Sequence, residues 1–130
     1  ILATTGEVLW VESEKQLDAV TALSGSGPAY VFYFLEAMAR AGTAMGLSAE
    51  QAHQLAVGTF VGASELARCS DEPPAVLRER VTSKGGTTYA ALQSLARDGV
   101  ADAFERAMRA SEQRAHELGE EGAGGAGPRP

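Results

Sequence analysis

The segment from Ala29 to Met45 is apolar on nearly every side of the helix that its residue pattern predicts. Almost all of its positions hold Val, Phe, Leu, Met or Ala, and the polar ones fall on one narrow stripe, namely Tyr33, Glu36, Arg40 and Thr43. A helix that is apolar almost all round is buried almost all round. Because a chain of 130 residues offers few places to bury such a helix, we expect a second subunit to cover it in a dimer.

Helical patterns and capping signals extend through most of the remaining chain. One helix is expected to begin at Glu14, and Pro28 suits the first turn of the next. Ser48-Ala49-Glu50-Gln51 is a capping box that opens another helix, Pro74 fits the start of a short one, and Gly99 precedes the last. The sequence therefore predicts an all-α fold, a bundle of about six helices, and its 45% of hydrophobic residues suffices for a core.

Both ends of the chain depart from this pattern. Val8-Leu9-Trp10-Val11 is a short apolar run, partly β-branched, that predicts one strand. One strand cannot form a sheet, and the chain begins at Ile1 without an initiator methionine, so we expect a fragment with sequence missing upstream. From Gly119 to Pro130 the composition is of low complexity, which predicts a disordered tail.

The acidic composition disfavours several classes of partner. A net charge of −6 argues against nucleic acid and against an anionic membrane surface, since phosphate binding needs a basic face. No apolar run approaches a membrane span and no signal peptide is visible, so we expect a cytoplasmic protein. Cys69 is the only cysteine, which excludes an intrachain disulfide. His53 and His116 lie on separate predicted helices and indicate solvated side chains, so no metal site is expected.

Two adjacent glycines, Gly85 and Gly86, separate two predicted helices. Gly85 and Gly86 end the first helix because glycine favours positive φ, and Thr87 and Thr88 then fall in the first turn of the next. First-turn N–H groups have no partner inside the helix, and the dipole there is positive. Together with the Ser83 hydroxyl, they predict a site for a small anion such as a carboxylate. The same residues also fit an ordinary helix–helix turn with a capping hydroxyl.

Other chemistry is weakly represented in the sequence. Gly25-Ser26-Gly27 lacks the third glycine and the preceding parallel-strand unit of a dinucleotide-binding loop. No set of nucleophile, base and orienting group can be assembled. The residues alone therefore predict a helical bundle with one anion-binding loop.

Two long segments resemble signatures of the pyrroline-5-carboxylate reductase family. Asp18–Tyr30, with the sequence DAVTALSGSGPAY, is similar to the family's linker-and-helix signature, and Pro74–Leu92, PAVLRERVTSKGGTTYAAL, is similar to its second signature. Their order and spacing also fit, and the resemblance covers roughly residues 6 to 118. Members of this family reduce the cyclic imine 1-pyrroline-5-carboxylate to L-proline with NADPH or NADH.

The resemblance implies a domain organisation. Residues 1–12 would end a Rossmann domain, residues 13–118 would form a helical dimerisation and substrate-binding domain, and residues 119–130 would form a disordered tail. The helical domains of two subunits would interleave in a homodimer, or in a higher oligomer of such dimers. Because the cofactor would bind mainly to the missing N-terminal domain, the chain alone is expected to be inactive.

The resemblance also implies roles for individual residues. The substrate carboxylate would be held by one loop, comprising Ser83, Gly85, Gly86, Thr87 and Thr88. Thr21 would place its hydroxyl near the imine nitrogen as a hydrogen-bond or proton-relay partner, although a helical threonine can instead bond its own backbone. Asp71 matches a position near the cofactor, or is a simple helix-end charge. Lys84 stands where many members have proline, which would stiffen the loop.

Two alternatives remain open. The chain could be a non-catalytic, reductase-like dimerisation module, which the sequence does not distinguish from an enzyme. It could also come from another two-domain NAD(P) dehydrogenase family. Those enzymes typically carry a catalytic lysine on a helix in this region, whereas the only lysines here are Lys15 and Lys84, neither inside a predicted helix that faces a cleft.

Overall fold

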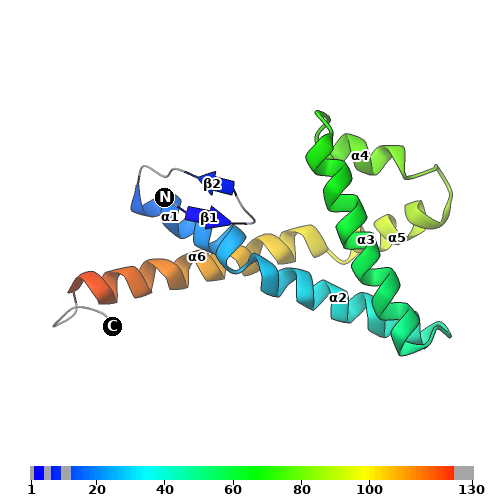
Figure 1. Ribbon diagram of the computed structural model, residues 1–130, viewed down its shortest axis with the longest axis horizontal. Helices are drawn as coiled ribbons and strands as arrows, with labels where there is room; N and C mark the ends of the chain where they lie inside the picture. The colour runs from blue at the N-terminus through cyan, green and yellow to red at the C-terminus, as the bar shows by residue number, and fades with distance from the viewer. Residues whose placement is uncertain (1, 5–6, 10–12, 125–130) are drawn as a thin grey trace. The chain divides into compact units, whose positions relative to one another are not determined.

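The computed structural model describes residues 2–4, 7–9 and 13–124 (Figure 1). Within these residues the chain forms six α-helices, one π-helical turn and two short strands. The predicted all-α fold class is thereby confirmed. In chain order the elements are β1 Leu2–Thr4, β2 Glu7–Leu9, α1 Glu14–Val20, η1 Thr21–Gly25, α2 Gly27–Ala44, α3 Ala49–Cys69, α4 Pro74–Arg80, α5 Thr87–Arg97 and α6 Val100–Gly124.

The chain divides into two compact units. The first comprises residues 1–30 and 101–130, and therefore holds the two strands, α1, η1, the start of α2 and nearly all of α6. The second comprises residues 31–100, with the rest of α2 and the whole of α3, α4 and α5. The helix α2 thus belongs to both units.

The N-terminal strand is paired, contrary to the prediction of a lone strand. Strand β2, Glu7–Leu9, overlaps the predicted run, and it pairs antiparallel with β1, Leu2–Thr4, so that Leu2 lies opposite Leu9. Because the apolar run Leu2-Ala3 precedes the predicted strand by only a few residues, it supplies a local hydrogen-bonding partner that the prediction overlooked. Trp10 and Val11, the end of the predicted strand, lie outside the described residues.

The last helix is longer than predicted. Helix α6 continues past Leu118 to Gly124, so residues 119–124, which the sequence predicted to be disordered, are helical. Residues 125–130 lie outside the described part. Side-chain pairs along one face support the added turns, as Arg114 Nη1 lies 3.1 Å from Glu117 Oε1 and 3.3 Å from Glu121 Oε2. A pair three residues apart, such as Arg114 and Glu117, stabilises an exposed helix by roughly 0.2–0.5 kcal/mol.

Helix starts follow the predicted capping residues. The Ser48 hydroxyl accepts the Gln51 N–H at 3.0 Å, and the Gln51 side-chain oxygen accepts the Ser48 N–H at 3.0 Å. This confirms the capping box at the start of α3. Pro74 occupies the first turn of α4, where its missing N–H costs nothing. Gly99 joins α5 to α6 with a φ of 62°, which only glycine adopts readily.

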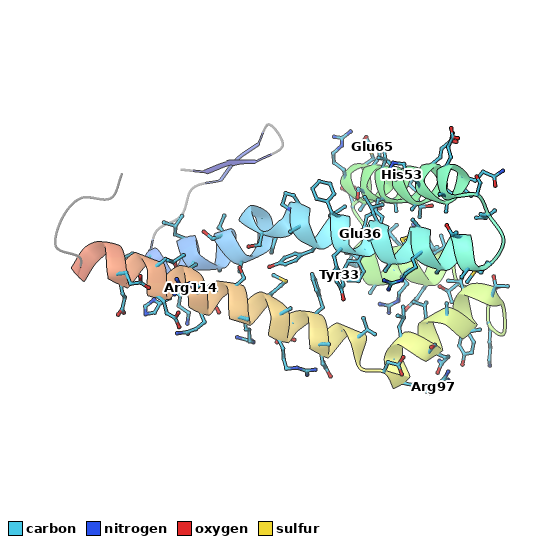
Figure 2. The ribbon with its side chains drawn as sticks, turned by 90° about the horizontal axis from the view of Figure 1, so that it is seen from below. Tyr33, Glu36, His53, Glu65, Arg97 and Arg114 are labelled. Atoms are coloured by element: carbon cyan, nitrogen blue, oxygen red, sulfur yellow. The ribbon has the colours of Figure 1, made fainter. Side chains whose placement is uncertain are left out.

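Very little of the apolar surface is buried within the chain. The buried apolar residues of the described part are all alanines, namely Ala22, Ala52 and Ala56. Large apolar side chains stand in solvent, such as Phe32 at 63% exposure and Leu66 at 67%. On α2, whose side chains Figure 2 shows with Tyr33 labelled, no residue is buried. No helix of the described residues is long and apolar enough to cross a membrane.

Replacing Ser48 with alanine tests the cap of α3. We expect Ser48→Ala to lower the free energy of unfolding by about 1 kcal/mol, because the Gln51 N–H loses its acceptor. Chemical denaturation at one fixed protein concentration measures the change. Ser64→Ala, inside the same helix, is the control and should leave stability within about 0.5 kcal/mol of the parent. Equal effects of the two substitutions would contradict the capping role.

Candidate functional site

A tight turn brings Ser83 and Gly86 together between α4 and α5. The Gly86 N–H donates to the Ser83 carbonyl at 3.0 Å, and Gly85 has a φ of 77°. A positive φ at the third residue is what a type II turn requires, which explains glycine there. Lys84 holds the second position, where proline is favoured because its φ is fixed. Lysine at this position leaves φ free where proline would fix it, so it changes the stiffness of the turn and leaves its geometry accessible.

Gly86 is needed for a different reason from Gly85. It is the residue before α5, and its φ of −88° is open to any amino acid. A Cβ atom built on it, however, would lie 3.2 Å from the Ser83 carbonyl oxygen and would collide with the Ser83 hydroxyl. One glycine of the pair thus provides backbone conformation and the other provides space.

The first turn of α5 carries unpaired backbone donors. The Ala90 N–H bonds to the Gly86 carbonyl at 3.1 Å, and no side chain caps the helix. In the part of the chain that the structure describes, no acceptor is recorded for the N–H groups of Thr87, Thr88 and Tyr89. They point out of the helix at the positive end of its dipole, where an anion binds favourably.

Three hydroxyls lie beside these donors. Ser83, Thr87 and Thr88 are exposed, and among the described residues none of their hydroxyls takes part in a recorded hydrogen bond. The capping hydroxyl of the ordinary-turn alternative is therefore not found. The structure brings together all five loop residues that the sequence singled out, and their donors can receive a carboxylate.

Thr21 lies in the first unit, at the start of η1, whereas the loop lies in the second. Its hydroxyl donates to the Leu17 carbonyl at 3.0 Å, which is the backbone bond that the sequence left as an alternative role. The side chain is exposed. The π-helical turn itself was not predicted, because the sequence indicated a break near Gly25. π-helical turns occur frequently at functional sites.

Asp71 lies in the short link between α3 and α4 and is exposed. The recorded polar contacts of this link belong to its neighbours, since the Glu72 N–H donates to Ser70 Oγ at 3.0 Å and the Glu72 carboxylate pairs with Arg80 at 3.2 Å. No recorded contact of the described residues joins Asp71 to the loop. Its expected place near a cofactor stays a prediction.

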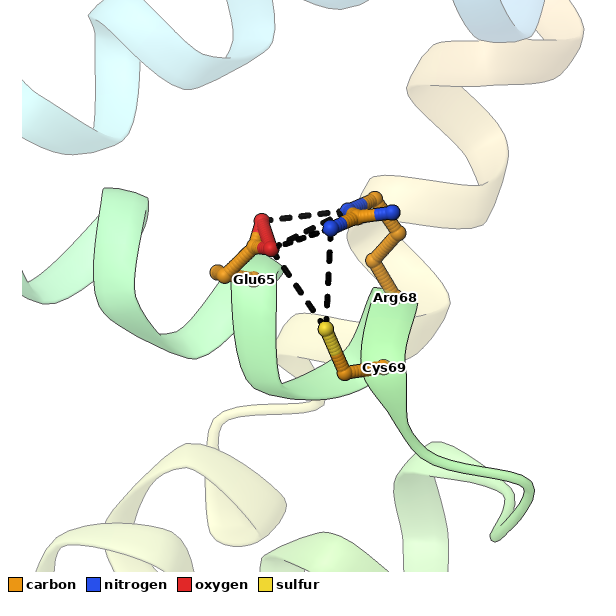
Figure 3. A network of polar contacts seen from close by, with 3 residues as sticks. All are labelled: Glu65, Arg68 and Cys69. Atoms are coloured by element: carbon orange, nitrogen blue, oxygen red, sulfur yellow. Dashed lines mark hydrogen bonds and ion pairs between the residues drawn. The ribbon is translucent and has the colours of Figure 1, made fainter.

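A polar cluster at the end of α3 was not anticipated from the sequence. Glu65 binds the Arg68 guanidinium through both carboxylate oxygens, and the Cys69 thiol donates to Glu65 Oε1 at 3.4 Å (Figure 3). The hydrogen bonds from Arg68, and to a lesser extent the one from Cys69, lower the pKa of Glu65. The spacing of Glu65 and Arg68 at i and i+3 was the available signal. No group of three or more metal-binding side chains occurs in the described ranges.

The glycines between η1 and α2 do not form a dinucleotide-binding loop. Gly25 ends η1 and Gly27 begins α2, so the glycine-rich segment lies between two helical elements. A dinucleotide-binding loop instead joins a strand to a helix. A nucleotide cofactor would therefore have to be bound by other residues than these.

The model of a family described as pyrroline-5-carboxylate reductase dimerisation matches residues 14–118. Among curated proteins, the pyrroline-5-carboxylate reductase of Pseudomonas aeruginosa is 47% identical over 121 residues, which are 93% of this chain and 44% of that protein. The enzyme of the same name from Corynebacterium melassecola is 44% identical over 119 residues, 92% of this chain and 44% of that protein.

Solved structures show the same likeness. A pyrroline-5-carboxylate reductase from Coxiella burnetii superposes with a TM-score of 0.83 at 42% identity, over 87% of this chain and 42% of that one. The Plasmodium falciparum enzyme, solved with NADP bound, gives 0.80 at 35% identity, over 83% of this chain and 41% of that one. The chain spans less than half the length of these relatives. With a match over most of its helices, the chain belongs to the pyrroline-5-carboxylate reductase dimerisation family.

Proposed function

We propose that this chain is the helical part of a pyrroline-5-carboxylate reductase, which reduces 1-pyrroline-5-carboxylate to L-proline with NADPH or NADH. The observation that carries the proposal is the Ser83–Thr88 loop. It presents unpaired N–H groups and hydroxyls that can bind a carboxylate, and the chain that contains it belongs to this family. The cofactor, which supplies the hydride, would be bound mainly by a Rossmann domain that residues 1–12 would end. One relative, from Plasmodium falciparum, was solved with NADP bound.

The loop suits the carboxylate of this substrate. A carboxylate accepts several hydrogen bonds, and charge-assisted bonds of this kind are about twice as strong as neutral ones. The N–H groups of Thr87, Thr88 and Tyr89 are fixed by α5 and need no rearrangement on binding. Lys84 adds a positive charge beside them. The loop would thus anchor the substrate at one end and fix the position of its imine carbon.

Thr21 would act on the imine nitrogen of the substrate. Because its hydroxyl proton is donated to the Leu17 carbonyl, the exposed Thr21 oxygen retains lone pairs that can accept a further hydrogen bond. A protonated imine nitrogen carries an N–H that can donate to this oxygen. The protonated imine is also the more electrophilic form, so a strong general acid is not required. Thr21 is therefore assigned as the hydrogen-bond acceptor, and Asp71 remains a candidate contact for the cofactor.

The exposed apolar helices support a homodimer. With only alanines buried in the described part, α2 and α3 lack the cover that a stable fold needs. The family description, dimerisation, agrees with cover by a second copy. The chain alone is proposed to be inactive, because the cofactor would bind mainly to another domain.

Replacing Thr88 with alanine in the full-length protein tests the carboxylate loop. We expect kcat/KM for the imine to fall roughly ten- to a hundredfold, because a charge-assisted hydrogen bond is worth about 1.5–3 kcal/mol. Thr88→Ser keeps the hydroxyl and should retain most activity. The KM for the nucleotide should change little, since it binds to another domain. Steady-state kinetics with each substrate varied in turn measures both effects.

Thr82→Ala is the matched control for this loop. It removes a hydroxyl that already donates to the Arg78 carbonyl at 2.6 Å, so we expect a small loss of melting temperature and an unchanged kcat/KM. Thr88→Ala behaving like Thr82→Ala would contradict the carboxylate assignment. A parent protein that folds and dimerises but reduces no imine would support the non-catalytic dimerisation module instead.

Replacing Thr21 with valine tests the acceptor role. Valine keeps the shape and removes the oxygen, so we expect kcat to fall roughly ten- to a hundredfold while the imine KM stays within about twofold. Thr21→Ser should recover most of the rate, because the serine hydroxyl can make the same bond to Leu17. A valine variant with the parent's kcat would show that Thr21 only bonds its own helix.

A further inference from the structure

We infer that Tyr30 is a positioning residue for Thr21, acting through the π-helical turn that Thr21 begins; the inference rests on the proposed function. Tyr30 lies in the first unit, near the start of α2, and is part-buried. Its hydroxyl donates to the Ala22 carbonyl at 2.6 Å. Ala22 follows Thr21 in the chain and is 3% exposed, which makes it one of the most buried residues described.

The π-helical turn creates the need for this hydrogen bond. In an α-helix the Ser26 N–H would bond to the Ala22 carbonyl, four residues earlier. Here the Ser26 N–H bonds to the Thr21 carbonyl at 2.8 Å, five residues earlier. The Ala22 carbonyl thereby loses its usual donor, and a buried carbonyl without a donor costs about 1–3 kcal/mol. The Tyr30 hydroxyl replaces that donor.

Further contacts fix Tyr30 and the turn against α6. The Tyr30 and Phe104 rings meet edge to face, with centroids 5.1 Å apart and an interplanar angle of 87°. The hydroxyls of Ser26 and Ser111 lie 2.9 Å apart. The ring contact holds Tyr30 independently of its hydroxyl. The hydroxyl is needed only for the hydrogen bond to the turn, and we expect its removal to leave the ring packing intact.

The consequence concerns the register of Thr21. Without the Tyr30 hydroxyl, the Ser26 N–H can return to the Ala22 carbonyl and the turn can relax to an α-helix. That change turns the residues at the start of η1 relative to α2, because each residue of an α-helix advances by about 100°. Thr21 would then present its oxygen in a different direction. The tyrosine thus stabilises the one helical register in which Thr21 is presented as proposed.

The test compares Tyr30→Phe with Tyr33→Phe in the full-length protein. Both substitutions remove one hydroxyl from α2, and among the described residues the Tyr33 hydroxyl has no recorded partner. We expect Tyr30→Phe to lower kcat roughly three- to tenfold with the imine KM within about twofold, and Tyr33→Phe to change neither. A loss expressed in KM alone, or equal effects of the two substitutions, would overturn the inference.

A double-mutant cycle separates positioning from a general loss of structure. If Tyr30 acts through Thr21, Tyr30→Phe should have little further effect on kcat once Thr21 is valine. Independent, multiplying losses would instead mean that Tyr30 is merely structural, and would overturn the inference.

The Ser26 amide resonance in an NMR spectrum gives a readout that needs no turnover. Because the Ser26 N–H is expected to change its acceptor from the Thr21 carbonyl to the Ala22 carbonyl, Tyr30→Phe should shift this resonance, whereas Tyr33→Phe should leave it in place. An unshifted Ser26 resonance in Tyr30→Phe would overturn the inference even in an active enzyme. A parent protein without imine reduction would refute the proposed function and, with it, any positioning for catalysis, while a shifted resonance would still show that Tyr30 holds the turn.

Discussion

The structure depends on covering apolar side chains that the chain does not cover itself. Fully burying one Val, Leu or Phe side chain stabilises a protein by about 1.5–3 kcal/mol, and whole domains are stable by only about 5–15 kcal/mol. Phe32 and Leu66 are 63% and 67% exposed, and other large apolar side chains are exposed as well. A second copy that covers a few of these side chains therefore decides whether the helices remain folded, and with them the elements that carry the site.

The proposed chemistry relies on position more than on strong acids or bases. At the loop, backbone N–H groups and neutral hydroxyls would meet the substrate. The two glycines serve two purposes, since Gly85 permits positive φ and Gly86 leaves room for Ser83. At the π-helical turn, Thr21 offers a lone pair because its proton is already donated to Leu17. Both arrangements are fixed by the helices before any substrate arrives, which lowers the cost of reaching the reactive geometry.

The sequence predicted what local chemistry determines. Caps, prolines and glycines located the helix starts, as at Ser48 and Pro74. The loop was anticipated because the unpaired N–H groups of a helix's first turn follow from helix geometry alone. The π-helical turn was missed because its hydrogen bond differs from the α-helical one by a single residue, and the donor for the Ala22 carbonyl comes from Tyr30 on another helix. The end of α6 was missed because Gly119, Gly122 and Gly124 have low helix propensity, which predicted a break where the structure continues the helix.

The most direct test of this account is the mass of the chain in solution. Sedimentation equilibrium at micromolar concentration, combined with thermal unfolding at several protein concentrations, should give a dimer or a multiple of it, with a melting temperature that rises with concentration. Assembly stabilises the folded state by mass action, so the two readouts should change together. A monomer that unfolds cooperatively at a concentration-independent temperature would contradict the account, because the exposed side chains of α2 and α3 would then need no partner.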